Sequence, residues 1–116
     1  MRHRVKKFTL GRKKAQRKAL LRNLAQSLVL HGAIRTTSAK AKALRTVVEP
    51  LVTRARRGTL ADRREIAKVL YTQDALRKMM DDIGPKYKER PGGYTRIIKV
   101  GHRPTDGADV VRIEFV

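Results

Sequence analysis

Residues 34–45, IRTTSAKAKALR, combine the residue types that bind phosphate. We expect a short strand at 33–37 and a helix that begins at 38, where the first backbone N–H groups have no partner inside the helix. The positive end of the helix dipole disfavours cations, yet the first turns hold lysines and no acid. A phosphate would accept from the free N–H groups and neutralise these lysines. The segment therefore predicts a nucleic-acid backbone contact through Arg35, Thr36, Thr37, Ser38, Lys40, Lys42 and Arg45.

Part of this helix start can also be satisfied within the chain. Thr37 or Ser38 can cap the helix with a side-chain oxygen, which leaves the remaining N–H groups available. The alternative interpretation is a solvated helix start that tolerates its lysines at a cost of about 0.3 kcal/mol.

A second segment, ERPGGYTRIIK at 89–99, also suits a ligand. Gly92 and Gly93 allow a close backbone approach or a turn with positive φ. Tyr94 and Arg96 follow at strand spacing on one face, where the ring can stack on a base or ribose and the guanidinium can bind phosphate. The alternative is a loop that enters a strand with a core tyrosine. Beyond it, Arg103 lies beside His102 in GHRPTDGA and is a further backbone-contact candidate.

The N-terminal stretch 1–14, MRHRVKKFTLGRKK, holds seven Lys and Arg residues. We expect an extended basic arm that a partner orders; the alternative is a disordered, solvated tail. The next helix, at roughly 12–31, has a leucine stripe, and Lys13 and Arg17 project onto the same face. Unpaired charges do not belong in a core, so the first turns should overhang the body. The RNA-binding candidates here are Arg2, His3, Arg4, Lys6, Lys7, Arg12, Lys13, Arg17 and Arg22.

The charge of the chain is large and uneven. The 116 residues carry a formal net charge of +19, with no cysteine. Residues 1–61 contain 17 Lys and Arg against one acid, Glu49, whereas 62–116 contain 12 against nine. Such a balance indicates a polyanionic partner and assigns binding to the first half. Without cysteine, disulfides and thiolate zinc sites are excluded, and no apolar run approaches the roughly 18 residues of a membrane helix.

Apolar periodicity gives a two-layer α/β (α+β) fold. Helices are expected at 12–31 and 38–57, the second kinked but not broken at Pro50, with Glu49 and Arg56 on its polar face. Two short helices follow, opened by Thr59 and Thr72, with Leu60 facing the core and Gly84-Pro85 as the stop. Period-two strands YTRIIKV and VVRIEFV form a hairpin. We predict a small mixed three-stranded sheet with helices on one face. Residues 1–14 form the arm, and 15–116 form one RNA-binding domain.

Enzymatic sites are poorly supported by the sequence. The three histidines, His3, His31 and His102, lack metal-ligand spacing, and Asp81-Asp82 suits a solvated helix end. No phosphate loop, nucleophile elbow or dinucleotide glycine pattern is present. We therefore expect no catalytic residues, no metal and no cofactor. The chain also lacks the aromatic pair of an RNA-recognition-motif sheet, which favours gripping of phosphates over base reading.

The chain resembles the bacterial large-subunit ribosomal protein seventeen family over its full length. The resemblance rests on MRH at the start, IRTTSAKAKALRTVVEPLVTRAR at 34–56 and RPGGYTRIIK at 90–99. It implies the order helix, strand, three helices, two strands. It also implies binding to large-subunit rRNA near the outer end of the polypeptide exit tunnel, beside large-subunit proteins twenty-two and thirty-two. The arm, KFTLGRKKAQR, departs from the commoner pattern because it lacks the Ser-Ser-His run.

The main hypothesis is that the chain is a structural ribosomal protein in the cytoplasm that stabilises rRNA. We expect it to bind neither a membrane nor a small-molecule substrate, and we expect no homo-oligomer. A basic DNA-compacting or regulatory protein is the alternative, because DNA offers the same phosphates. An enzyme acting on RNA is a third class.

Overall fold

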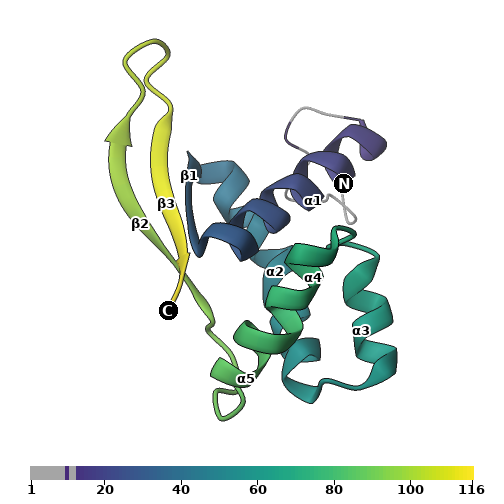
Figure 1. The fold of residues 1–116 in the computed structure, drawn as a ribbon. Helices are drawn as coiled ribbons and strands as arrows, with labels where there is room; N and C mark the ends of the chain where they lie inside the picture. The colour runs from purple at the N-terminus through teal and green to yellow at the C-terminus, as the bar shows by residue number, and fades with distance from the viewer. Residues whose placement is uncertain (1–9, 11–12) are drawn as a thin grey trace, which may run out of the picture.

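The computed structural model describes Leu10 and residues 13–116. Its elements follow the predicted order (Figure 1). The helices are α1 (Lys14–His31), α2 (Ser38–Arg57) and α3 (Leu60–Ala67), followed by one helical run made of α4 (Gln73–Lys78), the π-helical turn η1 (Met79–Ile83) and α5 (Gly84–Lys86). The strands are β1 (Ala33–Thr37), β2 (Thr95–His102) and β3 (Asp109–Phe115).

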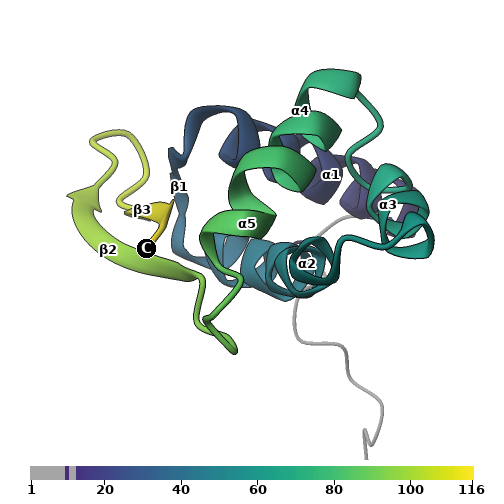
Figure 2. The same cartoon turned by 60° about the horizontal axis from the view of Figure 1, so that its bottom comes forward.

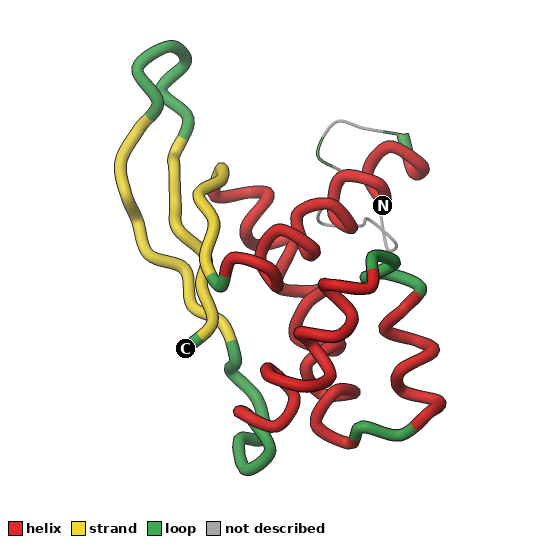
Figure 3. The backbone as a smooth tube through the Cα atoms, viewed as in Figure 1, coloured by secondary structure: helices red, strands yellow, loops and turns green. Residues whose placement is uncertain are grey.

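The sheet has three strands in the order β1-β3-β2, and both neighbouring pairs are antiparallel. The prediction of a mixed sheet was wrong, because the C-terminal hairpin inserts β3 beside β1 in the opposite direction. The predicted two-layer arrangement is confirmed: the helices lie on one face of the sheet (Figures 2 and 3). Ile34, Ile113 and Ile97 are aligned across the strands and belong to the core beneath the helices.

The two long helices supply most of that core. Buried residues of α1 begin only at Ala25 and continue to Val29, while α2 buries residues along its length from Ala41 to Ala55. The helix α2 continues through Pro50 without a break, as predicted. Gly32 ends α1 with φ 79°, a conformation that favours glycine, and its N–H donates to the Leu28 carbonyl at 2.7 Å.

The short helix α3 confirms the predicted cap. The Asp62 backbone N–H donates to the Thr59 hydroxyl at 3.1 Å, and that hydroxyl donates to the Asp62 carboxylate at 2.7 Å. Leu60 was predicted to face the core but is 63% exposed. The eight residues of α3 bury Ile66 instead, so Leu60 lies on the solvent side.

The expected helix stop at Gly84-Pro85 was wrong. The chain stays helical from Met79 to Lys86. The π-helical turn η1 leads directly into α5, which begins at Gly84. Pro85 therefore lies in the first turn of α5, where the N–H that proline lacks costs little. Gly84 is itself buried, lying against the backbone of Ala55 in α2.

Candidate nucleic-acid interface

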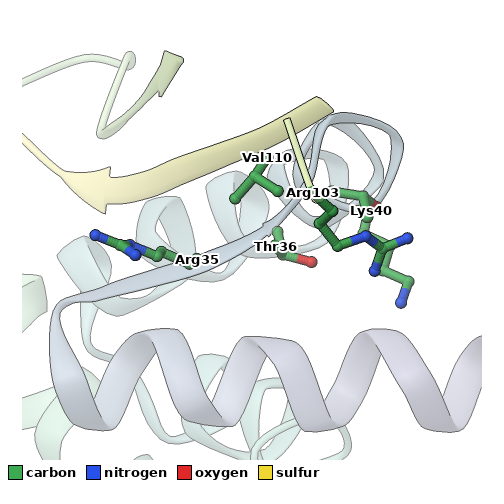
Figure 4. Close-up of a pocket in the computed structure, with 6 residues that line it drawn as sticks. Arg35, Thr36, Lys40, Arg103 and Val110 are labelled. Carbon is green, nitrogen blue, oxygen red and sulfur yellow. The ribbon is translucent and has the colours of Figure 1, made fainter. Parts of the chain in front are cut away.

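A cleft of about 370 Å³ opens where β1 meets α2. The register Thr37↔Val110 places the end of β1 beside the start of β3, and thereby beside the loop that joins β2 to β3. The cleft is consequently lined by residues far apart in the sequence, namely Arg35, Thr36, Thr37, Lys40, Arg103 and Val110 (Figure 4). All but Val110 are predicted phosphate contacts.

The start of α2 is open to a ligand. Thr37 occupies the N-cap position, but its hydroxyl makes no capping hydrogen bond within the described part of the chain. The expected side-chain cap by Thr37 is therefore absent there, in contrast to Thr59 at the start of α3. The first turn of α2 contains no acid. Its N–H groups thus keep the partial positive charge that favours an anion.

The cations around this helix start have no counter-ion among the residues that the structure describes. The ion pairs between described residues use other cations: Arg54 and Arg57 bind Asp62, Lys68 binds Glu65, and the remaining pairs lie on β2, β3 and their connecting loop. No ion pair in residues 13–116 involves Lys40, Lys42 or Arg45. Their charge is left for a partner.

Arg103 is more constrained than the sequence indicates. Its Nε and Nη2 donate to the Asp106 carboxylate at 3.0 and 2.6 Å. These bonds lower the pKa of Asp106 below its usual value, and the backbone N–H of Ala108 adds to the effect. Asp106 thereby fixes the loop that carries Arg103 and neutralises part of its charge. Arg103 borders the cleft as a positioned side chain, not as a free cation.

The side chains of the cleft divide between two directions. Figure 4 shows Thr36, Lys40 and Arg103 gathered together, while Arg35 points away from them. Successive residues of a strand face opposite sides of a sheet, which accounts for the divergence of Arg35 from Thr36. We define the phosphate cleft as Thr36, Thr37, Lys40 and Arg103.

The structure corrects the second predicted site. Tyr94 is 1% exposed, its ring packs edge-on against Tyr87 with centroids 5.4 Å apart, and its hydroxyl accepts from Arg56 Nη1 at 3.2 Å. It cannot stack on a base. Tyr94 precedes β2, so strand alternation does not place it on the same face as Arg96. Arg96 is exposed, and its Nη2 lies 3.1 Å from Glu114 Oε2. Gly93 has φ 64°, and Gly92 lines a shallow groove of about 450 Å³ against α2.

The first turns of α1 overhang the body, as predicted. Lys13, Lys14 and Lys18 are exposed and Arg17 is half-buried, while the buried positions of the helix start further along. Arg22 is also half-buried. The other arm candidates, Arg2, His3, Arg4, Lys6, Lys7 and Arg12, lie outside the described residues.

One residue was missed by sequence reasoning. Arg112 lies directly opposite Arg35 across β1 and β3. Strand alternation in VVRIEFV puts Arg112 on the face opposite to Val111 and Ile113. Only the strand order, however, reveals that its neighbour is a second arginine.

Two other kinds of site, a membrane-spanning helix and a metal centre, are not found among the described residues. In residues 13–116 and at Leu10, no helix is both long and apolar enough to cross a membrane. The same residues contain no cluster of three or more His, Cys, Asp or Glu side chains arranged to hold a metal ion.

Known proteins resemble the chain over its whole length. A family model described as Ribosomal protein L17 matches residues 20–116. The large ribosomal subunit protein bL17 of Gemmatimonas aurantiaca is 53% identical over 116 residues, covering 100% of this chain and 98% of that protein. The bL17 proteins of an Exiguobacterium species (52% over 112 residues, 92% and 96% covered) and of Rickettsia bellii (48% over 116 residues, 100% and 82% covered) are also similar. The chain therefore belongs to the ribosomal protein L17 family of the bacterial large ribosomal subunit.

Proposed function

We propose that the protein is a structural constituent of the large ribosomal subunit that binds and stabilises large-subunit rRNA by neutralising its phosphates. Family membership makes it a large-subunit ribosomal protein, and proteins of this kind are generally structural. The observation that carries the RNA-binding proposal is the phosphate cleft. There, the Thr36 hydroxyl and Lys40 converge on the N-terminus of α2, and among the described residues no side chain caps this helix and no acid pairs with Lys40.

These groups suit a phosphate in both geometry and charge. The N–H groups of α2 donate along the helix axis, and the Lys40 ammonium adds a full positive charge. The Thr36 hydroxyl can donate to a phosphate or a ribose oxygen. Tyr94, the aromatic side chain expected to stack on a base, is buried. The interface therefore binds the RNA through its backbone and shape and does not read bases. Each neutralised phosphate should add ~0.7–0.9 to the slope of log affinity against log salt.

The finer location follows from the family resemblance. We infer a position near the outer end of the polypeptide exit tunnel, beside large-subunit proteins twenty-two and thirty-two. The overhanging start of α1 and the basic arm before it would extend this contact into the surrounding rRNA. We also propose that residues 1–14 act as a basic arm and residues 15–116 as one RNA-binding domain.

The test uses Lys40→Ala, because this substitution should weaken RNA binding without lowering the stability of the fold. Lys40 lies at the unfavourable end of the α2 dipole, so its removal should leave thermal stability unchanged or raise it by about 0.3–1 kcal/mol. Binding to large-subunit rRNA, measured by filter retention over a salt series, should weaken, with the slope reduced by ~0.7–0.9. Lys68→Ala, an exposed cation of the same charge on the α3 side, is the control and should bind like wild type.

Two results would count against the proposal. If Lys40→Ala binds with unchanged affinity and salt slope, the cleft does not hold phosphate. If duplex DNA competes as well as structured rRNA does, the DNA-compacting alternative is favoured.

A further inference from the structure

No helix of the described residues covers the outer face of the sheet (Figure 2). This face carries a second basic surface. Two rows of the pairing register lie on it. One row is Ala33, Glu114 and Arg96, and the next is Arg35, Arg112 and Ile98. We define the outer basic face as Arg35, Arg96, Arg112 and Glu114.

Electrostatics on this face are unbalanced. Glu114 accepts a hydrogen bond from Arg96 Nη2 at 3.1 Å and forms an ion pair with Arg112 Nε at 3.3 Å. One carboxylate thus serves two arginines, and it is 15% exposed while their side chains are 57% and 53% exposed. Three guanidinium groups against one carboxylate leave a net charge of +2 on the face.

Arg35 is the least compensated member. It lies directly opposite Arg112, and like charges that face each other across two strands destabilise a sheet. No described acid forms an ion pair with Arg35. The two arginines border a hollow of about 180 Å³ together with Ala33 and Ile34. An anion in this hollow would relieve the repulsion.

The partner chemistry follows from these side chains. Guanidinium groups bind phosphate in a bidentate manner, and the contact of Arg112 with Glu114 among the described residues is made through Nε, so its Nη groups remain to bind a phosphate. Ile98 and Val100 are exposed on the neighbouring strand and offer apolar area beside the arginines, suited to the apolar side of a ribose. A nucleic-acid strand presents phosphates and riboses in alternation.

We propose that the outer basic face binds the backbone of a second rRNA segment, distinct from the segment in the phosphate cleft, so that the protein ties two segments together. The proposal rests on the proposed function and extends it. Arg35 also borders the phosphate cleft, but its side chain points away from Lys40 (Figure 4), and this divergence is the local reason for two segments.

The test compares hydroxyl-radical footprints of the full chain on large-subunit rRNA for wild type, Arg112→Gln and Lys40→Ala. Each substitution should remove protection from its own set of nucleotides, and the two sets should not coincide. Arg112→Gln should also reduce the salt slope by ~0.7–0.9, and Arg112→Lys should restore part of the protection because it keeps the charge. Lys68→Gln, which likewise loses one cation from one exposed ion pair, should leave the footprint unchanged. Thermal melts establish that each variant is folded.

The outcomes separate this inference from the proposed function. If Arg112→Gln leaves every protection in place while Lys40→Ala removes some, the second surface is refuted and the first stands. If both variants lose the same nucleotides, one segment covers both surfaces and the inference fails. If Arg112→Gln impairs incorporation into large subunits without altering the rRNA footprint, the occupant is an acidic protein partner and the RNA assignment is overturned. A wild-type protein that protects no rRNA would contradict both proposals.

Discussion

The backbone nitrogen of Tyr94 lies 3.1 Å from each carboxylate oxygen of Glu49. The same carboxylate accepts from the hydroxyl of Thr95 at 3.2 Å. Glu49 sits in the middle of α2, whereas Tyr94 immediately precedes β2 and Thr95 begins it, so this one side chain joins the helical layer to an edge strand of the sheet. It holds the loop that carries Gly92 and Gly93 against α2.

Replacing Glu49 by Gln should lower the free energy of unfolding by about 1.5–3 kcal/mol, the range for hydrogen bonds to a charged group. The amide keeps one acceptor but loses the charge, and its NH₂ group faces donors. Urea denaturation at neutral pH measures the change. Glu89→Gln removes an exposed acid and should have little effect; equal stability of the two variants would contradict the assigned role of Glu49.

Tyr94→Phe separates folding from RNA binding. The substitution removes the hydroxyl that accepts from Arg56 Nη1 at 3.2 Å and lies 3.4 Å from Thr53 Oγ1. Stability should fall by about 0.5–1.5 kcal/mol, because the ring stays packed and only the part-buried hydrogen bonds of the hydroxyl are lost. Affinity for large-subunit rRNA at a temperature where both proteins are folded should not change. A marked loss of affinity would restore Tyr94 as a contact.

Local patterns predicted the elements and most of the cleft. Residues that are close in sequence and share one face are enough to predict a helix or a strand. This holds for the leucine stripe of α1, for the valines and leucines of α2 and for the alternation of VVRIEFV. Thr36 and Lys40 were predicted because their residue types and spacing suit phosphate, and this does not depend on the rest of the fold. The overhang of α1 was found in the same way, from Lys13 and Arg17 on the leucine face.

Long-range contacts set the features that were missed. Tyr94 was assigned to a ligand because nothing near it in sequence reveals Tyr87 or Arg56, which enclose it. Glu49 was placed on the polar face of α2, but the Gly-rich loop passes over that face and supplies the donors. The neighbour of Arg112 depended on strand order, which local alternation does not determine.

Gly84→Ala tests the close approach of the helical run to α2. A Cβ at position 84 would lie 2.5 Å from the Ala55 carbonyl oxygen and 2.9 Å from its carbon, so the two helices would have to separate. We expect a loss of about 1–3 kcal/mol in unfolding free energy, the usual cost of overpacking a core. Gly92→Ala, where a Cβ meets no atom within 4 Å, is the matched control. Equal melting temperatures of both variants would refute the tight contact.

Asp62 should make stability fall at acid pH. The hydroxyl of Thr59 does most to lower the pKa of Asp62 below its usual value, and Arg57, whose Nη2 lies 2.8 Å from the carboxylate, adds to it. A lowered folded-state pKa gives stability that is complete above the unfolded pKa of about 3.9 and is lost as pH falls through the folded value. Urea midpoints of wild type and Asp62→Asn should therefore differ at pH 7 and converge below pH ~3.9. Because Glu65 and Asp106 titrate in both proteins, the difference between the two curves isolates Asp62, and a constant difference down to pH ~2 would contradict this assignment.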